Sequence, residues 1–405
     1  MHRRAMKGAI VVSIAAALAV SGCSSKSTTG GTSGGGSEAK LSIQAVGAFD
    51  TEGNALKAEA AATPVNPAGD GKAKCKDVAI AMTGALTGDD AALGLNIVNG
   101  VRLAVKQHND ANKDCKVELK EFDTEGSADK ATQVVPNIIN DKTVVGVVGP
   151  AFSGETQATG ELFSQAGLVS ATASATRPTL TDNGWKSFFR GLGSDALQGP
   201  AIANYVTKVK GAKKVCVIDD STPYGTGIAD EVKKTLGAAN DASCTMQVKK
   251  GDKDFSAVVT KMSAAKPDAI FYGGYYAEAA PLLSQLRAGN VEAVFSAGDG
   301  VNDPKFVELA GNAAKGAILG CPCGEGPESF QKAYADLAGQ EPGVYSAEAY
   351  DLATIMLTAI DQGKITRPDM LAFFKGYDGQ GLQGTYKWNA KGELEKSGVW
   401  MYEVK

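Results

Sequence analysis

The residues best suited to chemistry follow apolar runs that are predicted to be strands. The polar and aromatic residues among them are Ser153, Ser174, Thr176, Tyr224, Tyr275 and Asp299. The carboxyl ends of parallel strands form one edge of a sheet, and open α/β proteins bind their ligands at that edge. We therefore expect these loops to meet at one site.

The residue types in these loops suit a ligand that carries both charges. Ser153 opens a predicted helix, so its hydroxyl and the N–H groups after it suit a carboxylate. Asp299 lies between two glycines and can approach a cation closely. Tyr224 and Tyr275 offer apolar ring faces with a hydroxyl at the tip. A purely structural role is the alternative for each: a helix cap for Ser153, a cap or turn for Thr176, a turn for Asp299, and packing for the tyrosines.

Histidine chemistry is almost excluded by composition. The chain has two histidines, His2 and His108, and His2 falls in the N-terminal segment described below. One histidine cannot build a multi-histidine zinc site, and the sequence contains neither an H-E-x-x-H motif nor a phosphate-binding P-loop. We expect His108 to be a solvated residue at the end of a helix. The sequence thus predicts a protein that is not an enzyme, without a metal or cofactor.

The N-terminal segment indicates export. Residues 1–22 place basic residues before the apolar run 9–20, which is too short to span a bilayer and typical of a signal peptide. Val20-Ser21-Gly22-Cys23 resembles a bacterial lipobox, so Cys23 is expected to become lipidated and to anchor the protein on the extracytoplasmic face of the cell membrane. Residues 23–72 are expected to form a flexible tether. A plain signal peptide with a chance cysteine is the alternative.

Charge and length narrow the functional class further. The 405 residues carry a formal net charge of −4, and loss of the signal segment would leave 38 basic against 45 acidic residues. A mildly acidic chain without a basic stripe argues against nucleic-acid binding. The length favours two domains.

The cysteines suggest disulfides, since six remain once Cys23 is lipidated. Four of them lie beside predicted neighbouring strands, which favours two bridges: Cys75–Cys115 and Cys216–Cys244. Cys321 and Cys323 either pair with each other or stay reduced. Sequence alone permits many other pairings.

Strands and helices alternate along the chain from Cys75 onward. The first series contains predicted strands at residues 78–82, 117–122, 144–148 and 168–171. The second contains predicted strands at 215–218, 245–248, 269–272 and 293–296, with helices at 196–209, 225–238, 255–265 and 277–288. A hairpin around 389–392 and an apolar run over 399–404 follow. This alternation predicts two α/β lobes, each with a parallel sheet covered by helices.

Several of these stretches carry a family resemblance. The matching segments are Asp254–Ser256, Pro267–Tyr275, Gly84–Gly88, Gly191–Pro200 and Tyr224-Gly225. In them the chain, from about residue 73 to 402, resembles the leucine/isoleucine/valine-binding proteins, the type I periplasmic solute receptors of branched-chain amino acid ABC transporters. The resemblance implies the two-lobed periplasmic-binding-protein type I fold. Its three hinge crossovers would lie near Gly193, Cys321 and Lys396. Lobe 1 would then comprise residues 73–193 and 324–396, and lobe 2 would comprise 194–323 and 397–405.

The resemblance also implies roles for the site residues. Ser153, the backbone of Ser174 and Thr176 would hold the α-carboxylate of an amino acid. Its ammonium would be surrounded by Tyr224, Tyr275 and Asp299, although the family usually has Glu at the last position. The side-chain pocket would be lined by Leu93, Phe152 and Tyr345.

The function implied is capture of a free aliphatic amino acid, most simply as a monomer, and its delivery to an ABC transporter permease. A sensor of the same fold for an amide or other polar solute is one alternative. An anchored thiol oxidoreductase that uses Cys321-Pro322-Cys323 is another.

Overall fold

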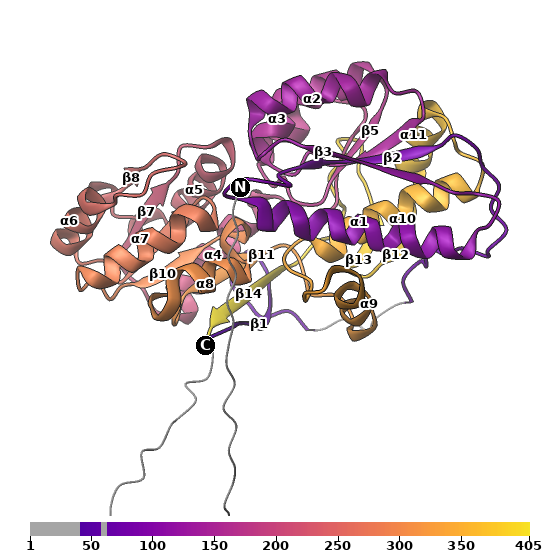
Figure 1. Ribbon diagram of the computed structural model, residues 1–405. Helices are drawn as coiled ribbons and strands as arrows, with labels where there is room; N and C mark the ends of the chain where they lie inside the picture. The colour runs from indigo at the N-terminus through magenta and orange to yellow at the C-terminus, as the bar shows by residue number, and fades with distance from the viewer. Residues whose placement is uncertain (1–40, 58–62) are drawn as a thin grey trace, which may run out of the picture. The chain divides into compact units, whose positions relative to one another are not determined.

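Two sheets with parallel cores organise the protein (Figure 1). The computed structural model describes residues 41–57 and 63–405, so the expected signal peptide and Cys23 lie outside the described residues. We call the five-stranded sheet and the helices packed on it lobe 1, and the seven-stranded sheet with its helices lobe 2.

Lobe 1 contains a wholly parallel sheet in the order β3-β2-β4-β5-β6. Its strands are β2 (Ala79–Gly84), β3 (Glu118–Asp123), β4 (Val144–Val148), β5 (Val169–Thr172) and β6 (Phe188–Arg190). All five residues of β4 are buried, as expected for a central parallel strand rich in valine. The helices of this lobe are α1 (Ala91–Ala111), α2 (Ala128–Asn140), α3 (Ser153–Gln165), α9 (Glu328–Ala338), α10 (Ser346–Asp361) and α11 (Arg367–Gly376).

Both faces of this sheet are covered, with α2 and α3 on one face and α1 and α10 on the other (Figure 1). Residues from α2 and α3, such as Ile138 and Phe163, pack with Ala81 and Val147 in one apolar cluster. Ser127 caps α2 by accepting a hydrogen bond from the backbone N–H of Lys130, which explains where this helix begins.

Lobe 2 contains a mixed sheet in the order β1-β14-β11-β10-β9-β7-β8. Its strands are β1 (Ile43–Phe49), β7 (Val215–Asp219), β8 (Met246–Gln247), β9 (Ala269–Gly273), β10 (Val294–Ala297), β11 (Ile318–Cys321) and β14 (Val399–Val404). The strands from β7 to β11 are parallel, whereas β14 and β1 are added antiparallel. The helices are α4 (Asp195–Asn204), α5 (Pro223–Leu236), α6 (Ser256–Ala265), α7 (Tyr276–Ala288) and α8 (Pro304–Ala310).

The expected two-lobed α/β fold is confirmed. The chain crosses between the sheets after β6, after β11 and before β14, near the three predicted hinge positions. The disulfides Cys75–Cys115 and Cys216–Cys244 are formed. Cys321 and Cys323 are bonded to each other at the second crossover, and both are buried.

The prediction of a flexible tether over residues 23–72 is wrong for residues 43–49. These residues form β1, which pairs with β14, and Phe49 packs edge-on against Tyr205 with ring centroids 4.9 Å apart. Burial of that ring at the end of the strand gives the segment a reason to order. The chain therefore passes from lobe 2 to lobe 1 a further time, between β1 and β2.

The predicted turn around residues 389–392 is confirmed, because Trp388 and Leu394 form an antiparallel bridge across it. A second hairpin, which was not predicted, turns at residues 382–383 between β12 (Asp378–Gly381) and β13 (Gly384–Lys387). One further prediction needs correction. His108 is not solvated, because it is fully buried and its Nε2 lies 2.9 Å from a carboxylate oxygen of Asp361 on α10. In the described part of the chain, no helix is both long and apolar enough to cross a membrane.

Candidate functional site

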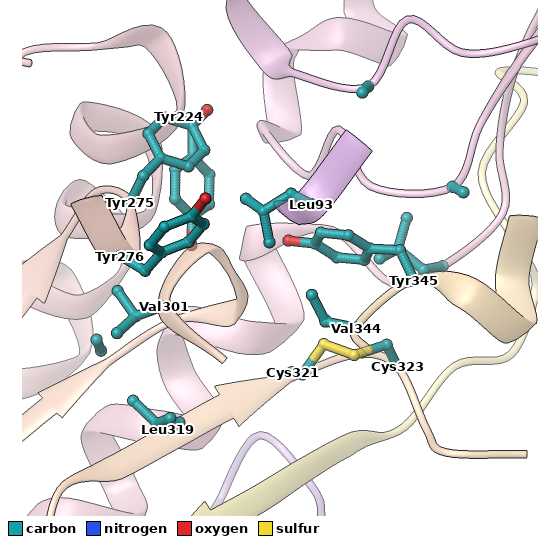
Figure 2. Close-up of a cluster of buried hydrophobic side chains, with 14 of the residues drawn as sticks. Leu93, Tyr224, Tyr275, Tyr276, Val301, Leu319, Cys321, Cys323, Val344 and Tyr345 are labelled. Carbon is teal, nitrogen blue, oxygen red and sulfur yellow. A yellow bond between two sulfur atoms is a disulfide. The ribbon is translucent and has the colours of Figure 1, made fainter. Parts of the chain in front are cut away.

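A cavity between the two lobes collects most of the residues singled out from the sequence. Its wall consists of Leu93, Ile97, Ala151, Phe152, Ser153, Ser174, Tyr224, Tyr275 and Tyr345. Figure 2 shows Leu93 between Tyr224, Tyr275 and Tyr276 on one side and Tyr345 on the other. Lobe 1 supplies the aliphatic side chains and the serines, and lobe 2 supplies Tyr224 and Tyr275.

The cavity is closed tightly. The volume of the cavity is about 10 Å³. This is close to the least space that one water molecule needs. A ligand with the size of an amino acid can therefore enter only if the lobes move apart.

The side of the cavity formed by lobe 1 suits an anion. Ser153 is the first residue of α3, so the N–H groups of that first turn have no partner within the helix. The Ser153 hydroxyl oxygen accepts a hydrogen bond from the Arg177 N–H at 3.2 Å. Ser174 donates its hydroxyl to the carbonyl of Ala151 at 2.5 Å, which ties the two loops together.

Glu155 fixes the first turn of α3 from inside. Its carboxylate accepts from the Phe152 N–H at 3.0 Å and from the Thr124 hydroxyl. Burial raises the pKa of Glu155 to about 7, and these hydrogen bonds lower it in part. The ring of Phe152 and the hydroxyl of Ser153 are thus held at the cavity by a buried carboxyl group behind them.

Asp299 lies behind the cavity wall and reaches it through tyrosines. Its Oδ1 accepts from the Tyr224 hydroxyl at 2.6 Å, and its Oδ2 accepts from the Tyr345 hydroxyl at 2.9 Å. The amide of Gln198 donates to Oδ1 at 2.9 Å. Burial raises the pKa of Asp299, and the hydrogen bonds from Tyr224, Gln198 and Tyr345 offset part of that rise.

The two glycines beside Asp299 make this approach possible. A Cβ atom on Gly298 would lie 2.6 Å from the Tyr224 hydroxyl oxygen, and one on Gly300 would lie 2.8 Å from the ring of Tyr224. Either methyl group would push Tyr224 away from the carboxylate. The sequence suggested that these glycines let Asp299 approach a cation. In the structure they leave the space that Tyr224 occupies.

A second buried carboxylate, Asp195, is joined to Asp299 by one side chain. The amide nitrogen of Gln198 donates to both, at 3.0 Å to Asp195 and 2.9 Å to Asp299. Burial and the neighbouring charge of Asp299 raise the pKa of Asp195 well above its usual value. Of the two carboxyl groups, Asp195 therefore holds a proton more readily.

The structure separates the predicted residues into two groups. The cavity is lined by seven of them: Leu93, Phe152, Ser153, Ser174, Tyr224, Tyr275 and Tyr345. Asp299 and Thr176 do not line it, because Asp299 lies behind the tyrosines and Thr176 is fully buried. The Thr176 hydroxyl has no hydrogen-bond partner in the described structure.

Sequence reasoning missed three contributors, Ile97, Ala151 and Gln198. Ile97 lies one turn after Leu93 on α1, so its helical spacing carried the signal. Gln198 lay within a stretch already noted for its resemblance, but no role followed from its type. Among the described residues, no cluster of three or more His, Cys, Asp or Glu residues is arranged to hold a metal ion.

The sequence of this chain is similar to those of known binding proteins. A family model described as "Periplasmic binding protein" matches residues 77–405. The leucine-, isoleucine-, valine-, threonine- and alanine-binding protein of Pseudomonas aeruginosa is 29% identical over 334 residues, which cover 80% of this chain and 89% of that protein. The leucine-specific-binding protein of Salmonella typhimurium is 28% identical over 334 residues, which also cover 80% of this chain and 89% of that protein.

Solved structures agree with this. The branched-chain amino acid transporter substrate-binding protein LivJ of Streptococcus pneumoniae, in complex with isoleucine, is 28% identical with a TM-score of 0.75. The match covers 82% of this chain and 99% of that one. The leucine-binding protein LivK of Thermotoga maritima is 25% identical with a TM-score of 0.73, over 81% and 97% of the two chains.

Proposed function

This chain belongs to the periplasmic binding protein family, and on that basis we propose that it captures a free aliphatic L-amino acid between its lobes. The observation that carries the proposal is the cavity wall. It combines an anion-suited helix start, a buried carboxylate reached through tyrosines, and aliphatic side chains, and it draws on both lobes.

The α-carboxylate would lie at the start of α3. Ser153 would donate its hydroxyl, and the N–H groups of the first turn would add their partial positive charge. The loop that carries Ser174 would complete this side. The Ser174 hydroxyl is already bound to Ala151, so its backbone is the part left for the ligand.

The ammonium would lie opposite, at the tyrosine hydroxyls. The Tyr224 and Tyr345 hydroxyls donate to Asp299, so their oxygens are left as acceptors. The Tyr224 oxygen also accepts from the Gly300 N–H at 3.1 Å, so only part of its acceptor capacity remains for a ligand. The negative charge of Asp299 strengthens these oxygens as acceptors. Both charges of a zwitterion would then be matched, which a ligand removed from water requires.

The side chain of the ligand would contact Leu93, Ile97 and the ring of Phe152. These groups offer no hydrogen-bonding atoms, so they favour an aliphatic side chain. The similar proteins are named for the binding of leucine, isoleucine, valine or branched-chain amino acids, which supports this choice.

We further propose that the protein is exported, lipidated at Cys23 and held at the membrane, where it hands its ligand to an ABC transporter permease. The signal segment and lipobox-like sequence support the anchor. Mass spectrometry of the N-terminal peptide from the native host tests it, and an unmodified Cys23 would contradict it.

Calorimetric titration with each of the twenty amino acids tests the binding function. We expect heat on binding of leucine, isoleucine or valine, and none with the amide acetamide or with benzoate. Failure of all twenty amino acids to bind to folded protein would overturn the proposal.

A further inference from the structure

An ion pair with a buried carboxylate joins the two lobes beside the cavity. Asp90 precedes α1 in lobe 1, and Lys250 follows β8 in lobe 2. The Lys250 Nζ lies 2.5 Å from Oδ2 of Asp90, whose side chain is 1% exposed. The pair therefore forms a charged contact between lobes that is removed from water on the Asp90 side.

Asp90 lies at a position where an aspartate side chain ordinarily caps a helix. It is the N-cap residue of α1, and an aspartate there normally accepts a hydrogen bond from the first turn of its own helix. The Asp90 side chain makes no such bond. Its Oδ2 reaches Lys250, and its Oδ1 has no hydrogen-bond partner among the described residues.

Lys250 also covers two rings of the cavity wall, one from each lobe. Its Nζ lies 5.4 Å from the ring centre of Phe152 in lobe 1 and 4.9 Å from that of Tyr275 in lobe 2. The two rings contact each other edge-on at 5.1 Å. A cation is attracted to aromatic ring faces, so the Lys250 ammonium stabilises the contact between the two rings and thus between the lobes.

The charges around Lys250 favour its ammonium form. Burial alone would lower the pKa of Lys250, but the charges of Asp90, Glu278 and Asp220 outweigh it and the pKa is raised. Asp220 and Glu278, both in lobe 2, each have one buried oxygen without a partner in the described structure. Without Lys250, closing the lobes would bring the Asp90 carboxylate toward two like charges.

We propose that Asp90 and Lys250 form a latch that holds the lobes closed over the ligand, so that Lys250 is a positioning residue for the binding site. The latch rests on the proposed function, since it acts on the closed, ligand-holding form. Neither residue lines the cavity. Its loss should therefore change how long a ligand stays bound more than how fast it arrives.

Dissociation of radiolabelled L-leucine from the purified full chain, chased with unlabelled leucine, tests the latch. Asp90→Asn and Lys250→Met should each raise the dissociation rate about tenfold, as for a charge pair whose carboxylate is buried, with the association rate changed less than about twofold. The double variant should be no faster than the single variants, because both remove one interaction. Unchanged dissociation, or additive effects, would overturn the proposal.

Lys253→Met is the matched control. Lys253 also faces lobe 1, with its Nζ 3.7 Å from Asp89, but those side chains are 62% and 69% exposed. An exposed pair contributes little, so this variant should release leucine at the wild-type rate. If Lys253→Met raised the dissociation rate equally, the effect would come from general surface charge, and the latch would be overturned.

A second measurement needs no ligand. The ligand-free chain also samples the closed form, and the latch would raise the closed fraction, so hydrogen exchange of the ligand-free full chain should be faster in Asp90→Asn than in wild type over the start of α1 and over residues 249–252. Unchanged exchange there would contradict the latch. Failure of wild type to bind any amino acid would contradict the proposed function instead, and this exchange experiment would still decide the latch.

Discussion

The hydroxyl of Tyr345 donates a hydrogen bond to Oδ2 of Asp299 at 2.9 Å, and both residues are buried. Tyr345 precedes α10 in lobe 1, whereas Asp299 follows β10 in lobe 2. The carboxylate that would balance a ligand ammonium is thus completed only when the lobes are together.

Removal of Asp299 should therefore weaken amino-acid binding strongly. We expect Asp299→Ala to cost about 2–5 kcal/mol of binding free energy, because the ammonium loses its buried countercharge. Calorimetry measures this. Asp299→Asn keeps the shape and should also bind weakly, and wild-type affinity in a folded Asp299→Asn protein would mean that the ammonium lies elsewhere.

Substitution of Ser153 should have a smaller effect. Ser153→Ala removes one hydroxyl, but the N–H groups of the first turn of α3 remain, so we expect a loss of about 1–3 kcal/mol. The same titration compares the two variants. A loss larger than that of Asp299→Ala would reverse the proposed ranking of the carboxylate and ammonium contacts.

Ligand binding should close the molecule. The cavity walls come from both lobes, so only the closed form supplies all of the contacts. Small-angle scattering of the full chain should give a smaller radius of gyration with saturating leucine than without it. An unchanged profile at saturation would contradict a ligand-driven closure.

Buried carboxyl groups should make stability fall as the pH rises. Burial raises the pKa of Glu348 to about 8, against about 4.3 in an unfolded chain. The unfolded state therefore releases its proton first, and the stabilising contribution that is full below about pH 4 is lost progressively up to about pH 8. Glu348→Gln should unfold at higher temperature than wild type at pH 8.5 and nearly equal it at pH 4.5.

The size of this effect is about 2–5 kcal/mol by the same linkage. Glu348 is fully buried, and only one of its oxygens has a partner, the Gly324 N–H at 3.1 Å. Glu328→Gln, at an exposed position of α9, is the control for the loss of a carboxyl group. A pH-independent difference between Glu348→Gln and wild type would contradict the raised pKa.

Most of the fold followed from the sequence because its signals are local. Valine runs such as 144–148 predicted a central strand with its observed bounds, and the strand-flanking cysteines predicted two bridges that are formed. Five strands were not predicted: β1, β6, β11, β12 and β13. β12 and β13 have no apolar pattern, whereas β6 and β11 are apolar but only three and four residues long.

The site was predictable as a set of loops but not as a set of contacts. The strand-end rule brought Ser153, Tyr224 and Tyr275 to one cavity. Sequence could not tell that Asp299 lies behind Tyr224, because this depends on how closely two glycines let a ring approach. The partnership of Asp90 and Lys250 also escaped, since the two residues lie far apart in the sequence and only the closing of two lobes brings them together.

The strand β1 lies before the segment matched by the family model, and it covers β14 at the edge of the lobe 2 sheet. β14 has the sequence Val-Trp-Met-Tyr-Glu-Val, and such runs of β-forming residues pair readily with other chains when exposed. β1 covers β14 and itself carries an irregularity between Ala45 and Gly47, which discourages further pairing. A chain shortened to begin at residue 77 would keep every cavity residue and yet present β14 to its neighbours.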